Sequence, residues 1–136
     1  MESLAADLAT MTRTPLHAEH VRAMRRVGEV RDFAVGEQIS ILGEPITTFY
    51  YVLEGEMEAI DPRTGGRYGD STLGPTQFFG EISFLNGGNA MLSARVIQPS
   101  KLLCVARKDM LRLMSEIPEM SDIIVTVFAA RRRPSR

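Results

Sequence analysis

The sequence lacks several features that would point to familiar protein classes. Its 136 residues contain one cysteine, Cys104, so no disulfide can form within the chain. The net charge is −1, which leaves no domain-wide basic surface for nucleic acid. No apolar run approaches the roughly 18 residues of a membrane-spanning helix, and no signal peptide is recognisable. These absences predict a domain that contacts neither membrane nor nucleic acid and resides in a reducing cytoplasm.

Signatures of catalysis and redox chemistry are also missing. The sequence has no Cys-x-x-Cys pair and no Gly-x-Gly-x-x-Gly loop, so we expect no enzyme, no redox centre and no dinucleotide cofactor in this chain. Apolar residues make up 44% and charged residues 24%, which is ordinary for a globular protein. The length matches one domain, so residues 1–136 are predicted to form a single unit.

What the sequence does contain is a middle region divided by glycines into short apolar or alternating runs. Such runs predict antiparallel strands in a sandwich or barrel, and the absence of strand–helix alternation argues against a parallel doubly wound sheet. Residues 61–66 (DPRTGG) are typical of a hairpin connection. The clearest strand candidates are residues 49–53, 57–60 and 101–105.

Helical patterns flank this region on both sides. In the N-terminal part, Ser3 can cap one helix, Thr14-Pro15 predicts the start of a second, and Gly28 predicts its end. In the C-terminal part, Pro118 predicts the start of the last helix. Two apolar faces are expected there: Met110, Leu111, Leu113 and Met114 on the first helix, and Met120, Ile123, Ile124, Val127 and Phe128 on the second.

The stretch over residues 78–96 carries the most informative chemistry. Gly80 lets the backbone approach a ligand closely, and a helical turn over residues 81–85 would offer free backbone N–H groups to an anion. The Glu81 carboxylate repels phosphate but accepts hydrogen bonds from a sugar hydroxyl. A nucleotide fits this pairing. The alternative is that Glu81 only caps the turn and Ser83 satisfies it locally.

Three segments, in order, resemble the cyclic nucleotide-binding domain family. Residues 79–85 (FGEISFL) look like its phosphate-binding cassette, residues 33–39 (FAVGEQI) like its opening strand, and residues 49–57 (FYYVLEGEM) like its glycine-containing hairpin. The resemblance covers residues 14–130. It implies a non-enzymatic regulatory module that senses a ligand and acts by moving its C-terminal helix.

The same resemblance implies the fold class: mainly β with flanking helices (α+β). An antiparallel β-roll, or jelly roll, of about eight strands would occupy residues 30–106. Helices would precede it in residues 1–29 and follow it in residues 107–133, and a short cassette helix would lie inside the roll.

The resemblance also implies residue roles. Glu81 would bind the ribose 2′-hydroxyl of cyclic AMP or cyclic GMP, and backbone atoms at Gly80, Ile82 and Ser83 would line the phosphate. Val125 and Phe128 would lie near the base on a lid helix. The candidate ligand-binding set is Phe79, Gly80, Glu81, Ile82, Ser83, Asn89, Ala90, Met91 and Ser93.

One departure from the family pattern concerns the phosphate. Family cassettes that bind ligand carry an arginine near their end, followed by small residues, and counting from Gly80 it falls at position 90 or 91. This chain has Ala90 and Met91 there. The nearest arginine, Arg95, lies about 13–17 Å further along an extended chain. We therefore predict weak or absent binding of cyclic AMP and cyclic GMP, with another small anion as an alternative ligand.

Two alternatives stay open for the larger context. Residues 90–96 and 128–133 resemble cyclic nucleotide-binding-type domains that precede thioredoxin reductase-like flavoproteins, which implies a regulatory or interaction domain fused to an oxidoreductase. The other is the sensor part of a transcription regulator without its DNA-binding domain. The apolar stripe of the last helix fits either a homodimer contact or packing on its own β-roll.

Three further side chains are candidates for chemistry. His17 and His20 have a spacing that can ligate a metal, but no clear constellation of other ligands accompanies them, so we expect surface histidines and no metal. Cys104 lies in an apolar strand run, which predicts a buried, unreactive thiol.

Overall fold

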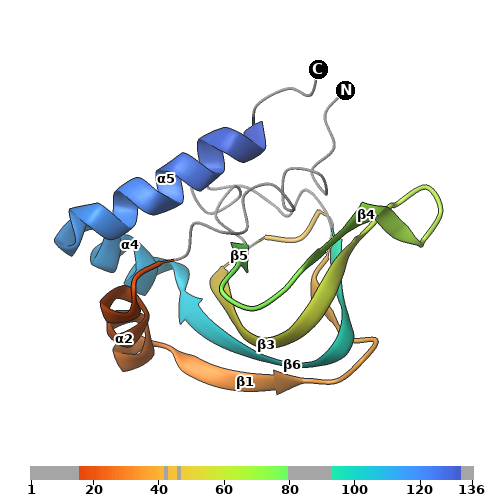
Figure 1. The fold of residues 1–136 in the computed structure, drawn as a ribbon, viewed down its shortest axis with the longest axis horizontal. Coiled ribbons are helices and arrows are strands. Elements are labelled where there is room, and N and C mark those ends of the chain that lie inside the picture. Colours follow the sequence, from red (N-terminus) through yellow and green to blue (C-terminus); the bar gives the residue numbers. More distant parts are fainter. Residues whose placement is uncertain (1–15, 42, 46, 80–92, 133–136) are drawn as a thin grey trace.

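The computed structural model describes residues 16–41, 43–45, 47–79 and 93–132. Within them, three helices flank one antiparallel sheet that curves into a roll (Figure 1). The elements are α2 (Ala18–Val27), β1 (Glu29–Phe33), β2 (Gln38–Ser40), β3 (Thr48–Ile60), β4 (Arg67–Leu73), β5 (Phe78–Phe79), β6 (Ser93–Ala106), α4 (Arg107–Glu116) and α5 (Pro118–Arg132). The predicted class, mainly β with flanking helices, is confirmed.

Six strands lie in the described part of the chain, where about eight were expected over residues 30–106. The predicted cassette helix over residues 81–85 and the predicted helix after Ser3 lie outside the described residues. No helix occurs in the described parts of residues 40–75, as the β-roll requires. None of the helices in the described ranges has the length and apolar character needed to cross a membrane.

Strands β3 and β6 form the spine of the sheet. They pair antiparallel, from Thr48 opposite Ala106 to Ile60 opposite Ser93. β1 and β2 pair with β6, whereas β4 and β5 pair with β3. Figure 1 shows both long strands bending strongly, and this curvature brings the sheet round into a roll.

Gly55 explains why two predicted strands are one. The sequence pattern predicts separate strands at residues 49–53 and 57–60, but β3 runs through both. Gly55 has a φ of 101°, and the β3–β6 register shifts on either side of it. A Cβ at this position would lie 2.6 Å from the Cα of Ser100. The glycine therefore bends the strand and lets β6 approach closely, instead of ending the strand.

Helix α2 begins later than the sequence predicts. Leu16 and His17 are not helical, so the predicted start at Thr14-Pro15 is wrong. His17 is the N-cap, with an extended ψ of 158°. Leu16, the first described residue, is buried in the main core.

The end of α2 is where the sequence places it. The Gly28 backbone N–H donates to the Met24 carbonyl at 2.8 Å. A Cβ on residue 28 would lie 2.5 Å from the carbonyl oxygen of Cys104. Glycine therefore allows the chain to leave the helix and enter β1 directly against β6.

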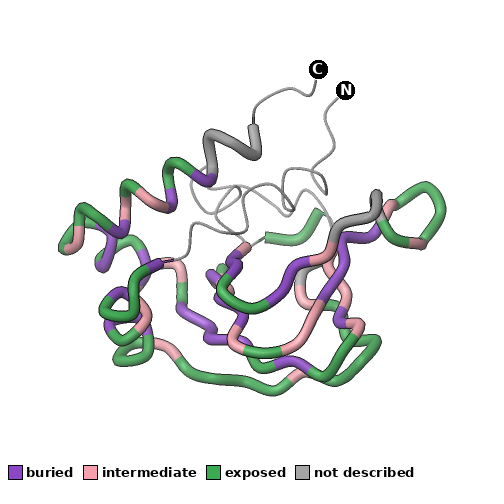
Figure 2. The backbone as a smooth tube through the Cα atoms, in the orientation of Figure 1, coloured by how far each residue is buried: buried purple, intermediate pink, exposed green. Residues whose placement is uncertain are grey.

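The main core lies between the helices and the adjacent ends of β3 and β6 (Figure 2). From α5 it receives Met120, Ile124 and Val127, and Ile123 packs at its margin. This part of the predicted stripe is thus buried within its own chain. The side chain of Phe128 lies outside the described residues.

Helix α4 corrects one assignment. Met110, Leu113 and Met114 are buried as expected, but Leu111 is 40% exposed. At about 100° per residue, Met110, Leu113 and Met114 fall within one arc of about 100° on the helix, and Leu111 lies about 100° from the centre of that arc, away from the core.

A second, smaller core lies on the face of β3 and β6 opposite to the main core and comprises Val52, Met57, Leu73, Leu102 and Cys104. The buried thiol of Cys104 matches the sequence expectation, and burial raises its pKa. At the far end of β3, the predicted hairpin connection is present, because the Asp61 N–H donates to the Gly66 carbonyl at 2.8 Å.

Candidate functional site

The predicted ligand segment is anchored at its entry by β5. Phe79 pairs with Tyr50 of β3, and the two rings stack with centroids 4.8 Å apart. The preceding residue, Phe78, is buried against Phe49 with ring centroids 5.3 Å apart. The Phe79 ring, which the sequence placed among the ligand contacts, thus packs on the aromatic side chain of the neighbouring strand.

The segment is anchored at its exit by β6. Ser93 is the first residue of that strand and pairs with Ile60 of β3. Entry and exit therefore meet the same strand, at Tyr50 and at Ile60. The predicted contacts between them lie outside the described residues and stay predictions: Gly80, Glu81, Ile82, Ser83, Asn89, Ala90 and Met91.

Of the two predicted lid residues, only the side chain of Val125 is described. Val125 is 46% exposed, whereas its neighbour Ile124 is fully buried. Helix α5 thus turns Ile124 toward the core and Val125 toward solvent. The buried face of the helix packs on the main core.

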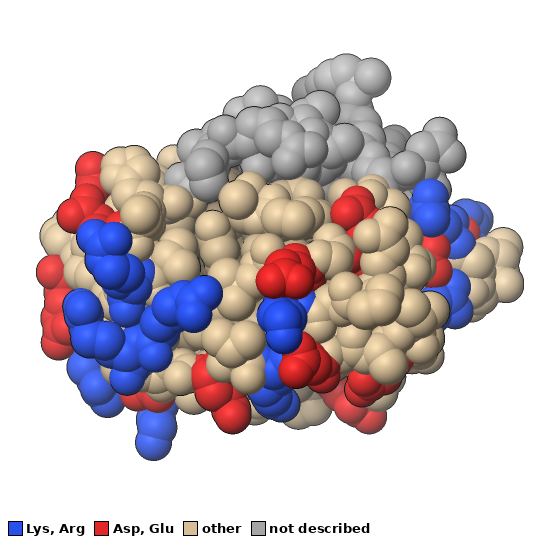
Figure 3. Space-filling view, turned by 60° about the horizontal axis from the view of Figure 1, so that its bottom comes forward, with Lys and Arg blue, Asp and Glu red and all other residues tan. Residues whose placement is uncertain are grey.

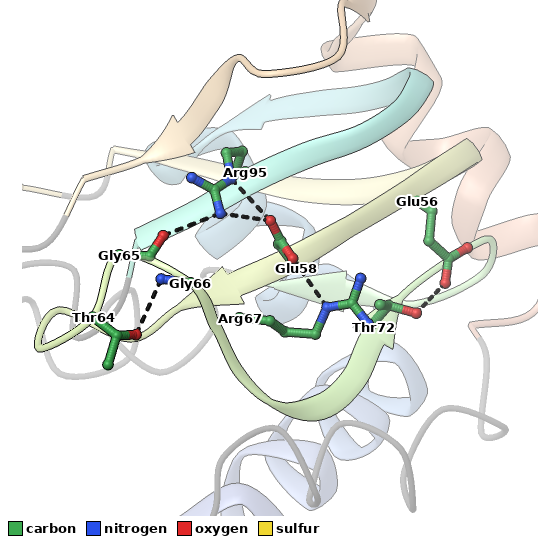
Figure 4. A network of polar contacts seen from close by, with 8 residues as sticks. All are labelled: Glu56, Glu58, Thr64, Gly65, Gly66, Arg67, Thr72 and Arg95. Atoms are coloured by element: carbon green, nitrogen blue, oxygen red, sulfur yellow. Dashed lines mark hydrogen bonds and ion pairs between the residues drawn. The ribbon is translucent and has the colours of Figure 1, made fainter.

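Arg95, the arginine nearest to the cassette in sequence, is held by a carboxylate. Its Nη2 lies 2.7 Å from Glu58 Oε2, and its Nε donates to the same oxygen at 2.9 Å. Its Nη2 also donates to the Gly65 carbonyl at 3.3 Å. Figure 4 shows this guanidinium between β3 and the hairpin. Because strand residues alternate, Arg95 and the fully buried Val96 point to opposite faces of β6.

Glu58 joins three strands. It is 8% exposed, it is the cross-strand partner of Arg95, and its second carboxylate oxygen accepts a hydrogen bond from Arg67 Nε of β4 at 3.0 Å. Beside this group, the Thr72 hydroxyl donates to the Glu56 carboxylate (Figure 4). The sequence interpretation missed Glu58. The available signal was a single glutamate in the otherwise apolar run Met57–Ile60.

The electrostatics of this group favour the charged state. Burial raises the pKa of the Glu58 carboxyl, but hydrogen bonds from Arg67 and Arg95 and the charges of both guanidinium groups outweigh burial, so the net pKa is lowered. Glu58 therefore stays ionised at neutral pH. The arginine that could have replaced the missing phosphate partner is engaged in a charge-assisted interaction.

Charge is distributed unevenly over the surface despite the near-zero total. Basic side chains gather at the end of the molecule where α2 and α4 lie (Figure 3). Along β1, by contrast, cations and anions alternate, and Lys101 Nζ pairs with Asp32 Oδ1 at 2.8 Å. The exposed basic residues of the two helices are Arg22, Arg25, Arg26, Lys108 and Arg112.

Comparisons with known proteins agree with this geometry. The family model for the cyclic nucleotide-binding domain matches residues 30–116. The cyclic AMP receptor protein of Thermus thermophilus is 29% identical over 104 residues, which cover 76% of this chain and 48% of that protein. The chain therefore spans about half the length of this relative.

Two solved structures share the fold. The crystal structure of the Thermus thermophilus catabolite activator protein superposes with a TM-score of 0.74 at 25% identity, covering 89% of this chain and 57% of that one. A second, described for a cyclic-GMP-dependent signalling pathway that regulates bacterial phytopathogenesis, gives a TM-score of 0.73 at 26% identity. It covers 86% of this chain and 94% of its own.

Proposed function

The chain belongs to the cyclic nucleotide-binding domain family, and from this premise we propose that it is a non-enzymatic regulatory module that binds cyclic AMP or cyclic GMP weakly or not at all. Weak or absent nucleotide binding is inferred from one observation, which is that the sequence has no lysine or arginine at the end of the cassette. Positions 90 and 91 hold alanine and methionine, and the nearest arginine, Arg95, is paired with Glu58.

The energetic argument concerns one negative charge. A cyclic phosphate diester brings that charge into a partly dry pocket, where backbone N–H groups alone must hold it. Losing one partner of a buried charge-assisted pair costs about 2–5 kcal/mol, which is roughly 30-fold to several thousand-fold in affinity. Binding is therefore expected to be micromolar at best.

The regulatory output would come from α5. This helix follows α4 directly and packs on the main core through Met120, Ile124 and Val127. A ligand that favours one position of the helix shifts its population by the difference in affinity for the two positions. At concentrations near or below its dissociation constant a weakly bound ligand occupies few molecules, so we expect α5 to stay close to its present packing when cyclic nucleotide is added.

The partner on which this module acts is part of the proposal. Since the chain spans 48% of the Thermus thermophilus relative, an effector region in the same protein or on another chain fits the family pattern. Val125 leaves apolar surface on the outer side of α5, which supports a homodimer contact through that helix.

The test restores the missing cation. Met91→Arg places a guanidinium at one of the two positions where ligand-binding family members carry their arginine, counted from Gly80. Leu92→Arg places a guanidinium directly before the small residues Ser93 and Ala94, because the family arginine is followed by small residues. Met91→Gln is the matched control, because it adds a polar side chain of similar length without charge. Affinities of all four proteins, wild type included, for cyclic AMP and cyclic GMP are measured by calorimetric titration.

We expect at least one arginine variant to bind at least tenfold more tightly than wild type, while Met91→Gln does not. An equal gain in Met91→Gln would mean that polarity or space, not charge, limits binding. No gain in either arginine variant would overturn the missing cation as the reason for weak binding.

A further inference from the structure

Both histidines of the chain meet at the point where α2 touches α5. His17 caps α2, His20 lies in its first turn, and their rings stack with centroids 4.9 Å apart. The sequence interpretation expected both at the surface. His17 is exposed, but His20 is 1% exposed, so that expectation is wrong for His20. Helix α5 covers it and brings Glu119 to its imidazole.

The ligand atoms of this cluster are close together. His20 Nε2 lies 3.2 Å from Glu119 Oε1, and His17 Nδ1 lies 3.5 Å from the same oxygen. Glu19 Oε1 lies 4.0 Å from His17 Nδ1. The four side chains each offer one atom, and these four atoms all lie within 4.8 Å of one another.

The separations between these atoms match a tetrahedral metal centre. A metal lies in the plane of each imidazole that binds it, so the exposed His17 ring must turn out of its stacked position against His20 to bind the same ion. Zinc bonds of about 2.0–2.1 Å place neighbouring tetrahedral ligand atoms about 3.3–3.4 Å apart. The two separations from Glu119 to the histidines already have this length, within a few tenths of an ångström. Glu19 has a 66% exposed side chain, so it is free to rotate inward as the fourth ligand.

We propose that His17, His20 and Glu119, with Glu19 as the fourth donor, form a binding site for a divalent transition-metal ion of the Zn²⁺ type. Two imidazoles and two carboxylates suit such an ion, whereas Ca²⁺ and Mg²⁺ require shells built from oxygen. The ligands come from α2 and α5, so the ion would fasten the C-terminal helix to the N-terminal one.

The proton arrangement sets the strength of binding. In the structure the His17 backbone N–H donates to His20 Nδ1 at 3.2 Å, so a neutral His20 carries its proton on Nε2, the atom that lies 3.2 Å from Glu119 Oε1. An ion on Nε2 requires that proton to move to Nδ1, which removes the long hydrogen bond from His17. We therefore expect micromolar affinity, weaker than that of a dedicated structural zinc site.

The experiment uses the untagged chain, because a histidine tag would bind the same ions. Zn²⁺ is titrated calorimetrically, and Co²⁺ absorption reports the coordination geometry. His17→Ala and Glu119→Gln remove one ligand each. Asp122→Asn is the matched control, because it removes an exposed acid of α5 that lies outside the cluster.

We expect one Zn²⁺ per chain, a tetrahedral Co²⁺ spectrum without a sulfur charge-transfer band, and at least tenfold weaker binding in both ligand variants but not in the control. Mg²⁺ and Ca²⁺ should not compete. Equal Zn²⁺ affinity in wild type and His17→Ala, or a wild-type dissociation constant weaker than about 100 µM, would overturn the proposal. Neither readout involves cyclic nucleotide, so the two proposals fail separately.

Discussion

The two ends of the β-roll are held together by different forces. At the helical end, fourteen buried residues form the main core, and they come from Leu16, α2, α4, α5 and the adjacent strands. At the hairpin end, the buried Glu58 links β3, β4 and β6 through Arg67 and Arg95. The helical end depends on apolar burial, whereas the hairpin end adds a buried charge network to the apolar side chains of Ala59, Ile60 and Val96.

This difference bears directly on ligand binding. A cation placed in a structural network is no longer available to a phosphate, and the hairpin end uses two arginines for one carboxylate. The helical end holds its polar groups differently, in a cluster where histidines and glutamates from two helices converge. The comparison predicts that mutations at the two ends change the free energy of unfolding by different amounts. It also predicts that only the change at the hairpin end depends on pH and on the charge of the new side chain.

The largest effect should follow from truncation at the helical end. Phe49 is fully buried and packs on Phe78, so Phe49→Ala is expected to lower the free energy of unfolding by about 3–5 kcal/mol. Urea unfolding followed by circular dichroism measures the change. Val30→Ala, at a 43% exposed position on β1, is the control. Similar losses of unfolding free energy in the two variants would mean that the main core contributes no more to stability than the exposed strand β1.

A smaller loss is expected at the hairpin end. Glu58→Gln keeps the shape but leaves two guanidinium groups without their shared carboxylate, and about 1–3 kcal/mol of stability should disappear. A double-mutant cycle with Arg95→Gln isolates the pair, with an expected coupling of about 0.5–3 kcal/mol. A coupling of zero would show that Arg95 is not held by Glu58 in solution.

Lowering the pH should reduce the difference in the free energy of unfolding between wild type and Glu58→Gln. The folded-state pKa of Glu58 is lowered, so its contribution is complete above the ordinary carboxyl value of 4.5 and is lost as the pH falls through the folded value. Unfolding of both proteins at pH 7 and at successively lower pH tests this, because the other carboxylates cancel in the difference. A gap that stays constant or widens on acidification would contradict a lowered pKa.

The smallest effect is expected for an exposed ion pair. Asp32 and Lys101 lie 2.8 Å apart, but their side chains are 78% and 46% exposed. Asp32→Asn should leave the free energy of unfolding unchanged within error, because exposed pairs contribute little. A loss of unfolding free energy as large as that of Glu58→Gln would mean that the exposed and the buried ion pairs contribute equally to stability.

The parts of the fold that were predictable are those set by local patterns. The apolar stripe of α5, its start at Pro118, the end of α2 at Gly28 and the hairpin at residues 61–66 all follow from side chains close in sequence. Gly55 was misjudged because a glycine ends a strand or bends it according to what approaches from another strand. Here Ser100 of β6 makes that approach.

The candidate site was less predictable, since its features join distant segments. Glu58 and Arg95 are separated by 37 positions, and the contact of His20 with Glu119 joins the two ends of the chain. Sequence patterns identified Arg95 as the nearest cation, but only the strand register shows that Glu58 faces it. The roles of Gly80 and Glu81 rest on the family resemblance and stay predictions.

The most direct measurement is a calorimetric titration of the wild-type chain with cyclic AMP and, separately, with cyclic GMP at neutral pH. Because residues 80–92 contain no lysine or arginine and Arg95 is paired with Glu58, we predict micromolar or weaker binding for both nucleotides, or no measurable heat. Nanomolar binding of either nucleotide would contradict this. It would mean that Arg95 leaves Glu58, or that another cation reaches the phosphate.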